Sequence, residues 1–220
     1  LIKDRHNIMK RTIFLDSASL RDIAYAEEVG CVGGITMNPS LLAREHVVDV
    51  IDHLRNIVHM FSGTIMYQPI ALENGYLEDA QRALELDSER ICIKVPPLAR
   101  YMPIARRLKT DGYAVALTAV TTGEQIAIAG AINANYIIPY VDRAANDHRG
   151  SDNIVNEIMT YGTGDIPVIA ASVKTMQQLS ECYFQGAYAV STSMKVIEEL
   201  LSEDMAIEAM QSFDLEYNHD

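Results

Sequence analysis

Lys94 is the residue of this chain best placed to do covalent chemistry. It lies in residues 91–96 (ICIKVP), a short run rich in β-branched residues that ends in proline, and this pattern predicts a buried strand. A lysine is seldom fully buried unless it is paired or functional, because removing an ammonium from water is expensive. The same desolvation favours the neutral amine, which can attack a carbonyl and form a Schiff base. Taken alone, Lys94 could equally reach solvent from the end of its strand.

The rest of the chain alternates short apolar runs with longer amphipathic stretches, giving eight strand–helix units, and a long helical pattern is expected after the second strand. The predicted strands are residues 12–16, 33–36, 64–70, 91–96, 113–118, 136–141, 167–172 and 187–192. Eight such units predict a compact (β/α)8 barrel. A doubly wound open sheet is the alternative, but it usually has fewer units and a glycine-rich first turn. The first turn here, Asp16-Ser17-Ala18-Ser19, has no GxGxxG motif, which favours the barrel.

Every predicted strand has an aliphatic body and a polar or ionisable end. These end residues are Asp16, Thr36 with Asn38, Gln68, Lys94, Thr118, Tyr140 with Arg143, Ser172, and Ser191 with Thr192. In a barrel the carboxyl ends of the strands converge at one mouth, where barrel enzymes have their active sites. Strand ends are also polar simply because they meet solvent, so each residue alone is weak evidence. Their convergence on one amine favours an active site.

Composition limits the classes of function. The chain has 220 residues, of which 49% are hydrophobic, and this is enough for one large core in a single domain. The net charge of −12 argues against nucleic acid and anionic membrane surfaces as partners. No apolar run approaches the roughly 20 residues that span a bilayer. Cys31, Cys92 and Cys182 are odd in number and lie in apolar runs, so we expect reduced core cysteines in a cytoplasmic protein.

The sequence lacks the motifs of several other kinds of site. No strand end carries a histidine, and there is no phosphate loop or GxSxG elbow, so we expect neither a metal nor a cofactor.

The two ends of the chain fall outside the eight units. Residues 1–10 are expected to be a leader or disordered, and residues 11–202 to form the barrel. Residues 203–220 hold an acidic helix and tail, whose apolar face can pack on its own barrel or on a neighbouring subunit.

Six fragments together resemble a known family. They are FLDSA (14–18), GITMNPS (34–40), IKVP (93–96), LTAV (117–120), PYVDR (139–143) and AAS (170–172). In this order they are similar to the strand-end signatures of the transaldolase family, and more narrowly to its short members, the fructose 6-phosphate aldolases. The resemblance runs from about residue 12 to residue 202. It implies a metal-free barrel enzyme that performs aldol cleavage or transfer on a sugar phosphate.

The resemblance also implies catalytic roles. Lys94 would attack the C2 ketone, and the iminium so formed would accept electrons as the C3–C4 bond breaks. Asp16 would be the carboxylate near the C4 hydroxyl. Gln68, Thr118 and Tyr140 resemble the group that holds one water beside the imine, and this water would relay protons.

Binding roles follow from the same resemblance. Thr36, Asn38 and Ser172 would form hydrogen bonds with the hydroxyls of the donor. Arg143 would bind the phosphate of glyceraldehyde 3-phosphate, a task that suits the fork of donors on a guanidinium, with Ser172 or Lys174 assisting. An exposed salt bridge is the alternative role for Arg143.

Two positions indicate which reaction of the family this chain performs. Transaldolases typically have glutamate where this chain has Gln68 and phenylalanine where it has Tyr140, so both residues favour the aldolase subgroup, which releases free dihydroxyacetone. Ile138 departs from the pattern, because related enzymes usually have a small or hydroxyl side chain there. A branched side chain would crowd the donor pocket, and hydroxyacetone or another ketose phosphate would fit at least as well as dihydroxyacetone.

The sequence therefore predicts a cytoplasmic Schiff-base aldolase that cleaves or forms fructose 6-phosphate. Its partners would be glyceraldehyde 3-phosphate and dihydroxyacetone or a related ketone. The alternatives are a transaldolase, which moves a dihydroxyacetone unit between sugar phosphates, and a barrel that binds sugar phosphates without turning them over. The resemblance also implies a homo-oligomer, a pentamer or decamer, in which the C-terminal helix crosses to a neighbour.

Overall fold

The computed structural model describes residues 12–70, 75–148, 150–201 and 204–217, and its strands form one parallel sheet that curves into a barrel. The strands are β1 (Thr12–Asp16), β2 (Val32–Met37), β3 (Thr64–Tyr67), β4 (Ile91–Val95), β5 (Val115–Val120), β6 (Tyr136–Pro139), β7 (Ile169–Val173) and β8 (Ala189–Thr192). They are neighbours in the order β6-β5-β4-β3-β2-β1-β8-β7. Isolated bridges between Ile137 and Val168 and between Tyr140 and Ala171 bring β6 to β7. The predicted (β/α)8 barrel is confirmed.

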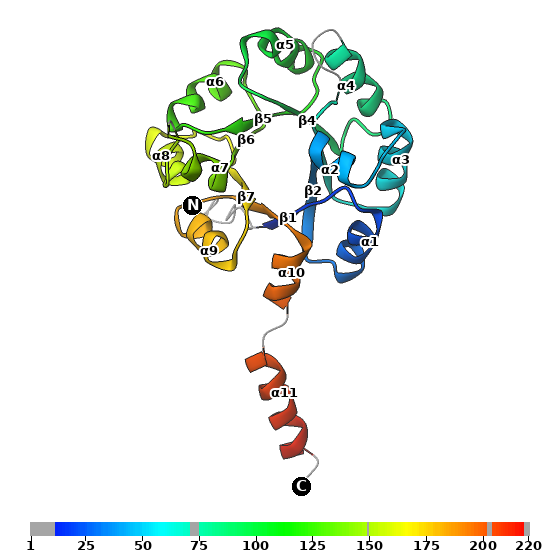
Figure 1. The fold of residues 1–220 in the computed structure, drawn as a ribbon, viewed down its shortest axis with the longest axis vertical. Coiled ribbons are helices and arrows are strands. Elements are labelled where there is room, and N and C mark those ends of the chain that lie inside the picture. Colours follow the sequence, from blue (N-terminus) through cyan, green and yellow to red (C-terminus); the bar gives the residue numbers. More distant parts are fainter. Residues whose placement is uncertain (1–11, 71–74, 149, 202–203, 218–220) are drawn as a thin grey trace, which may run out of the picture.

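Helices surround the outside of the barrel, except for α11 at the C-terminal end, which extends away from it (Figure 1). They are α1 (Leu20–Val29), α2 (Pro39–Arg44), α3 (Val50–Met60), α4 (Tyr76–Leu84), α5 (Met102–Thr110), α6 (Ile126–Ala131), α7 (Val141–Asn146), α8 (Ile154–Tyr161), α9 (Met176–Phe184), α10 (Met194–Leu201) and α11 (Asp204–Tyr217). Short 3-10 helices, η2 (Ala99–Tyr101) and η3 (Gly123–Gln125), lead into α5 and α6. No helix in the described part of the chain is both long and apolar enough to cross a membrane.

Side chains alternate between the two faces of the barrel wall, and each face has its own apolar cluster. In β4 the outward side chains Ile91, Ile93 and Val95 belong to the cluster that also contains the helices' apolar faces. The inward cluster fills the interior with Phe14, Met66, Cys92, Ala116, Ile138, Ile169 and Ala189, among others. Because successive residues of a strand point to opposite faces, Lys94 shares the inward face with Cys92.

Local signals explain where α1 begins and ends. The Ser19 side chain accepts a hydrogen bond from the backbone N–H of Asp22, which is the usual way to cap a helix start. Ile23 and Ala26, three residues apart, are buried against the barrel. Gly30 ends the helix with φ at 70°, a left-handed conformation that glycine adopts without strain. Because Ser19 caps α1 at its start, only a short link separates the helix from Asp16 at the end of β1.

The structure differs from the sequence-based expectation in two connections. The single long helical pattern expected after the second strand is broken into α2 and α3, with His46 between them in a positive-φ conformation (53°). The third strand was expected to reach residue 70 but ends at Tyr67, just before Pro69, which has no N–H for a sheet hydrogen bond. Gln68 is therefore a loop residue. The expected leader at residues 1–10 lies outside the described residues.

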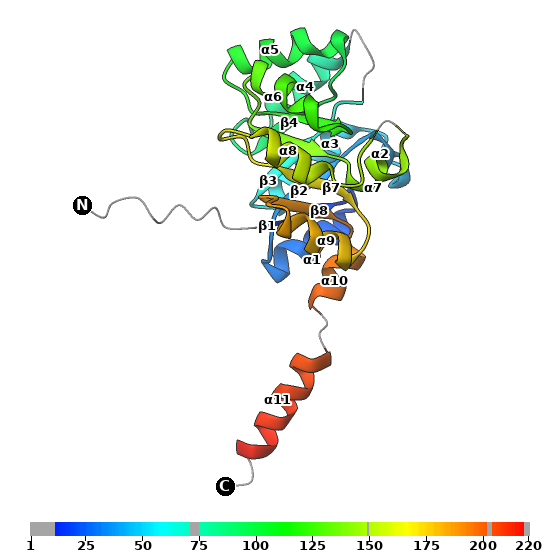
Figure 2. The ribbon, with the colours of Figure 1, turned by 90° about the vertical axis from the view of Figure 1, so that its left-hand side faces the viewer.

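α11 extends away from the barrel, as Figures 1 and 2 show. Its apolar side chains Ile207, Met210 and Phe213 recur every three residues, which places them along one side of the helix. All three are exposed, Met210 and Phe213 by about two thirds. An exposed apolar stripe of this kind is typical of an interaction surface.

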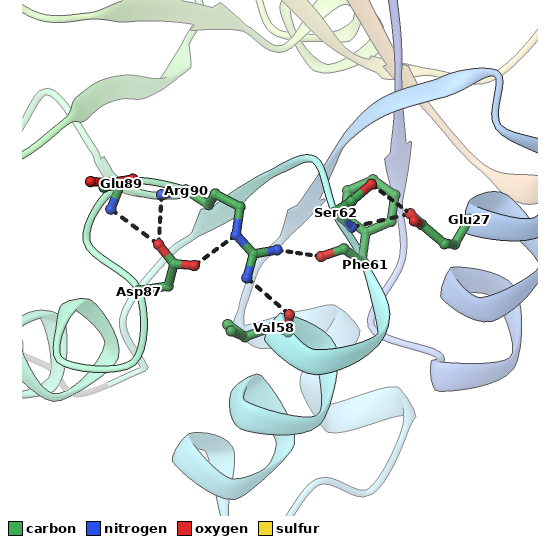
Figure 3. A network of polar contacts seen from close by, with 7 residues as sticks. All are labelled: Glu27, Val58, Phe61, Ser62, Asp87, Glu89 and Arg90. Atoms are coloured by element: carbon green, nitrogen blue, oxygen red, sulfur yellow. Dashed lines mark hydrogen bonds and ion pairs between the residues drawn. The ribbon is translucent and has the colours of Figure 1, made fainter.

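Arg90 fastens the turn before β4 to the end of α3 (Figure 3). Its guanidinium donates to the backbone carbonyl of Val58 at 2.9 Å and to that of Phe61, and these carbonyls lie in the last turn of α3 and just after it. The Arg90 Nε also pairs with Asp87 at 2.7 Å. Burial alone would raise the pKa of the Asp87 carboxyl, but its hydrogen bonds with Arg90 lower that pKa below its ordinary value.

We expect Arg90→Met to lower the free energy of unfolding by about 1–3 kcal/mol, because two carbonyls and a carboxylate lose a charged donor. Urea denaturation followed by circular dichroism measures the change. Arg55→Met is the matched control, since the Arg55–Asp52 pair is about half exposed on both sides and contributes at most about 1 kcal/mol. Equal losses in the two variants would contradict a structural role for the Arg90 contacts.

Candidate active site

A cavity opens at the carboxyl ends of the strands, with Lys94 on its wall. Its lining residues are Asp16, Asn38, Ser40, Leu41, Arg44, Lys94, Tyr140, Asp142, Arg143, Ala171, Ser172 and Lys174. Seven of the site residues expected from the sequence are in this set. Thr36, Gln68 and Thr118 are expected site residues that do not line it. The position of the cavity is that of active sites in barrel enzymes.

Lys94 is buried in the barrel interior, with 1% of its surface exposed. Its Nζ donates to the backbone carbonyl of Met37 at 3.3 Å. The Tyr76 hydroxyl donates to the Lys94 carbonyl at 2.6 Å, which fixes the main chain that carries the amine. In the described part of the chain, no carboxylate lies within ion-pair distance of this Nζ. The amine is thus withdrawn from solvent, held by one neutral acceptor and directed at the cavity, which suits a nucleophile.

Asp16 is held by a chain of buried hydroxyls. Thr36 Oγ1 donates to Asp16 Oδ1 at 2.8 Å. Because a hydroxyl has one hydrogen, the 2.6 Å contact between Thr36 and Ser191 must have Ser191 as its donor. Residues 16 and 36 are paired in the register of β1 and β2, which places these two side chains next to each other. The hydroxyl of Thr36 therefore faces Asp16, and only 1% of the residue is exposed.

Tyr140 and Thr118 lie at the bottom of the cavity, on the side opposite Asp16. Thr118 Oγ1 donates to the Tyr140 hydroxyl at 3.5 Å, a long hydrogen bond between two buried groups. Tyr140 lines the cavity, and Thr118 lies behind it. Ile138, two residues earlier in β6, is fully buried in the inward cluster beneath Tyr140 and does not reach the cavity wall.

Gln68 is half-buried in the loop after β3, and the chain on either side of it is held by one carboxylate. Asp79 Oδ2 accepts from the Tyr67 hydroxyl at 2.9 Å and from the backbone N–H of Ile70 at 2.8 Å. Burial, followed by the nearby Asp79 charge, raises the pKa of Tyr67, so its phenol stays protonated and remains a donor. Asp79 thus fixes the backbone that presents Gln68.

Asn38 caps α2 and still faces the cavity. Its Oδ1 accepts from the backbone N–H groups of Ser40 (3.0 Å) and Leu41 (3.2 Å), and Pro39 occupies the first helical turn. The carbonyl of the side-chain amide is therefore used by the helix. The Nδ2 group, which can donate two hydrogen bonds, is left for a ligand.

Cationic side chains gather at the mouth. Arg143 lies over the ring of Tyr140, with its Cζ 5.0 Å from the ring centroid. Lys174 follows β7, next to Ser172, whose φ of 59° is unusual for a residue other than glycine. Arg44 lies at the end of α2. Within the described residues, none of these three cations has an ion pair.

Sequence reasoning missed Ser40, Leu41 and Arg44, which line the cavity from α2. Their signal was the spacing of three and four residues that places side chains on one helix face, directly after the strand-end residue Asn38. Asp142 and Ala171 were also missed, although each adjoins a predicted site residue. No group of three or more histidine, cysteine, aspartate or glutamate residues in the described part could hold a metal ion.

Comparisons with known proteins agree with this geometry. The family description "Transaldolase/Fructose-6-phosphate aldolase" matches residues 13–219. A "Probable transaldolase" from Halalkalibacterium halodurans is 28% identical over 209 residues, covering 94% of this chain and 98% of that protein. Another from Geobacillus thermodenitrificans is 27% identical, covering 93% and 97%.

Solved structures support the fold alone. A mandelate oxidase mutant with a monooxide FMN adduct aligns with a TM-score of 0.59 at 14% identity, over 84% of this chain and 64% of the other. The same oxidase mutant with 4-Br-2-hydroxy-methylphenylacetate gives a TM-score of 0.59 at 15% identity, over 84% of this chain and 65% of the other.

The match to the family covers nearly all of the chain, and the chain belongs to the transaldolase/fructose-6-phosphate aldolase family, which is a family of enzymes.

Proposed function

We propose that this chain is a metal-independent class I aldolase that cleaves or forms a ketose phosphate, with fructose 6-phosphate as the reference substrate. The observation that carries the proposal is the Lys94 amine, which is buried to 1% exposure yet lies on the wall of the cavity. A barrel that merely binds sugar phosphates has no need of a desolvated amine, since burying one is unfavourable.

The chemistry begins at Lys94. Its Nζ adds to the C2 ketone, and the carbinolamine loses water to give an iminium. Asp16 accepts the proton of the C4 hydroxyl while the C3–C4 bond breaks, and the bonding electrons enter the iminium to form an enamine. The aldehyde then leaves. A water beside the imine, held by Tyr140, Thr118 and Gln68, protonates the enamine carbon and hydrolyses the imine.

We also propose binding roles for residues that line the cavity. Asn38, through Nδ2, and Ser172 donate to hydroxyls of the donor part of the substrate. Arg143, assisted by Lys174, binds the phosphate of the aldehyde part. For Thr36 we propose a different role from the expected contact with donor hydroxyls: it holds the Asp16 carboxylate in place through their 2.8 Å hydrogen bond.

Transaldolase is the second candidate reaction, favoured by the names of the two bacterial relatives. Both reactions share the imine and the enamine and differ in whether water or an aldehyde intercepts the enamine. Gln68 and the Tyr140 hydroxyl support the aldolase, because each can hold a water there. The donor is dihydroxyacetone or a related ketone; Ile138, which was expected to crowd the donor pocket, is fully buried and does not line the cavity, so it does not restrict the donor to a smaller ketone.

We further propose that the protein is a cytoplasmic homo-oligomer, a pentamer or decamer. Three free cysteines, two of them buried, suit a reducing compartment. The exposed stripe Ile207, Met210 and Phe213 on α11 suits burial against a second copy of the chain.

The nucleophile can be trapped. Borohydride added with dihydroxyacetone or hydroxyacetone should reduce the imine, inactivate the protein, and add the mass of the reduced ketone to the peptide that contains Lys94. Peptide mass spectrometry locates the label, and Lys94→Met should take up none. Chelators should leave activity unchanged. A label on another lysine, or activity lost to chelation, would overturn the mechanism.

Tyr140→Phe should separate cleavage from transfer. Losing the hydroxyl loosens the water beside the enamine, and one hydrogen bond to a reacting group is worth about 1–3 kcal/mol, roughly ten- to hundredfold in rate. Release of free ketone from fructose 6-phosphate should fall by that factor, while transfer to erythrose 4-phosphate is kept or raised. Gln68→Glu should act in the same direction.

Tyr136→Phe is the matched control, because it removes a hydroxyl from the same face of β6 four residues earlier. It should leave the ratio of transfer to cleavage unchanged. Equal losses of cleavage and transfer in Tyr140→Phe and Gln68→Glu would show that these residues do not set the type of reaction.

Cutting the chain after Ser202 should reduce the size of the assembly, because the apolar stripe of α11 is removed. Light scattering coupled to size-exclusion chromatography measures the mass. In the full chain, Met210→Ser with Phe213→Ser should have the same effect, whereas Glu208→Ser, an exposed polar control on the same helix, should not. A truncated chain of undiminished oligomeric state would show that α11 does not hold the subunits together.

A further inference from the structure

The three cations at the mouth come from two sides of the barrel. Arg143 and Lys174 follow β6 and β7, which are neighbours, whereas Arg44 ends the helix that follows β2. In the closed strand order, β2 and β6 are four positions apart in either direction and are therefore diametrically opposed. Figure 1 shows α2 and α7 on opposite sides of the barrel opening. β4, which carries Lys94, lies midway between them in this order.

The surroundings of Arg44 leave its charge available to a ligand. The other lining residues on its side of the mouth, Asn38, Ser40 and Leu41, are neutral. Of the two lining carboxylates, Asp142 is on the Arg143 side, and Asp16 is held on the floor by Thr36.

The position of Arg44 in α2 does not by itself account for this arrangement. A basic residue in the last turn of a helix is favourable, but that interaction does not require the side chain to face the cavity. The following residue, Glu45, lines a different surface hollow together with Asp49 and Asp52. Arg44 lines the cavity and forms no ion pair with any residue that the structure describes, and in a chain of net charge −12 such an arginine is better explained by an anionic ligand.

We propose that the cavity takes a substrate with an anionic group at each end, such as a ketose that carries a phosphate on the carbons at both ends. Arg143 with Lys174 binds the anionic group on the aldehyde side. Arg44 binds a second phosphate or carboxylate at the ketone end, and the carbonyl between them reaches Lys94. The proposal rests on the proposed function for the identity of the carbonyl, whereas the two anion subsites can be tested without catalysis.

Open-chain hexitol phosphates have no carbonyl and cannot form an imine, so they report binding alone. Isothermal titration calorimetry of the full chain would compare hexitol 6-phosphate with hexitol 1,6-bisphosphate. We expect the bisphosphate to bind at least about tenfold more tightly, because a second phosphate gains charge-assisted hydrogen bonds. A hexonic acid 6-phosphate, with a carboxylate at carbon 1, shows which of the two anionic groups Arg44 prefers.

Variants assign the two subsites. Arg44→Gln should abolish the advantage of the doubly charged ligands and leave the Kd of hexitol 6-phosphate within about twofold. Arg143→Gln should weaken all of these ligands, and the control Arg55→Gln, whose side chain pairs with Asp52 outside the cavity, should change none. The proposal is wrong if neither doubly charged ligand binds more tightly than the monophosphate, or if the advantage survives in Arg44→Gln. Failure of borohydride trapping at Lys94, by contrast, would overturn the reaction and leave this binding result intact.

Discussion

Keeping the Lys94 amine inside an apolar barrel is the constraint on which the rest of the site depends. An ammonium loses several kcal/mol of hydration when buried, and among the residues that the structure describes only the backbone carbonyl of Met37 accepts a hydrogen bond from Lys94 Nζ. The barrel accommodates the buried amine because β4 pairs with a parallel strand on each side and the Tyr76 hydroxyl donates to the Lys94 carbonyl. Burial of the amine is unfavourable for stability but suits the proposed chemistry, because an amine withdrawn from water can attack a carbonyl.

The groups around Lys94 differ between the two ends of the cavity: those beneath it are buried and hydrogen-bonded, and those at its mouth are exposed. Beneath the cavity, every buried side-chain nitrogen or oxygen in the described residues has a hydrogen-bond partner, and the Ser191–Thr36–Asp16 chain holds the Asp16 carboxylate at the cavity. At the mouth, Arg44, Arg143 and Lys174 are exposed. Under the proposed mechanism, proton transfer is carried out by residues on the strands and charge recognition by residues on the elements that follow them, as in other barrel enzymes.

The sequence predicted what depends on periodicity and did not predict what depends on register and turns. Lys94 faces inward because the two-residue alternation of β4 puts it on the side of Cys92, and that could be deduced from the pattern alone. Thr36 was expected to touch the donor, but the pairing of β1 with β2 sets it against Asp16, and the pairing register cannot be deduced from the pattern of one strand. Arg44 was overlooked because it lies at the end of α2, beyond the strand-end residues, and reaches the cavity only through the helical spacing that it shares with Ser40 and Leu41.

Oxygen exchange tests the central claim, that Lys94 forms an imine with a ketone, most directly. Imine formation expels the ketone oxygen as water, and hydrolysis restores it from solvent. With hydroxyacetone or dihydroxyacetone in oxygen-18 water, the native chain should label the ketone oxygen well above the rate without protein, as measured by mass spectrometry. The Lys94→Met variant should not exceed that background rate. Exchange at the background rate with the native chain, or undiminished exchange in Lys94→Met, would contradict the account.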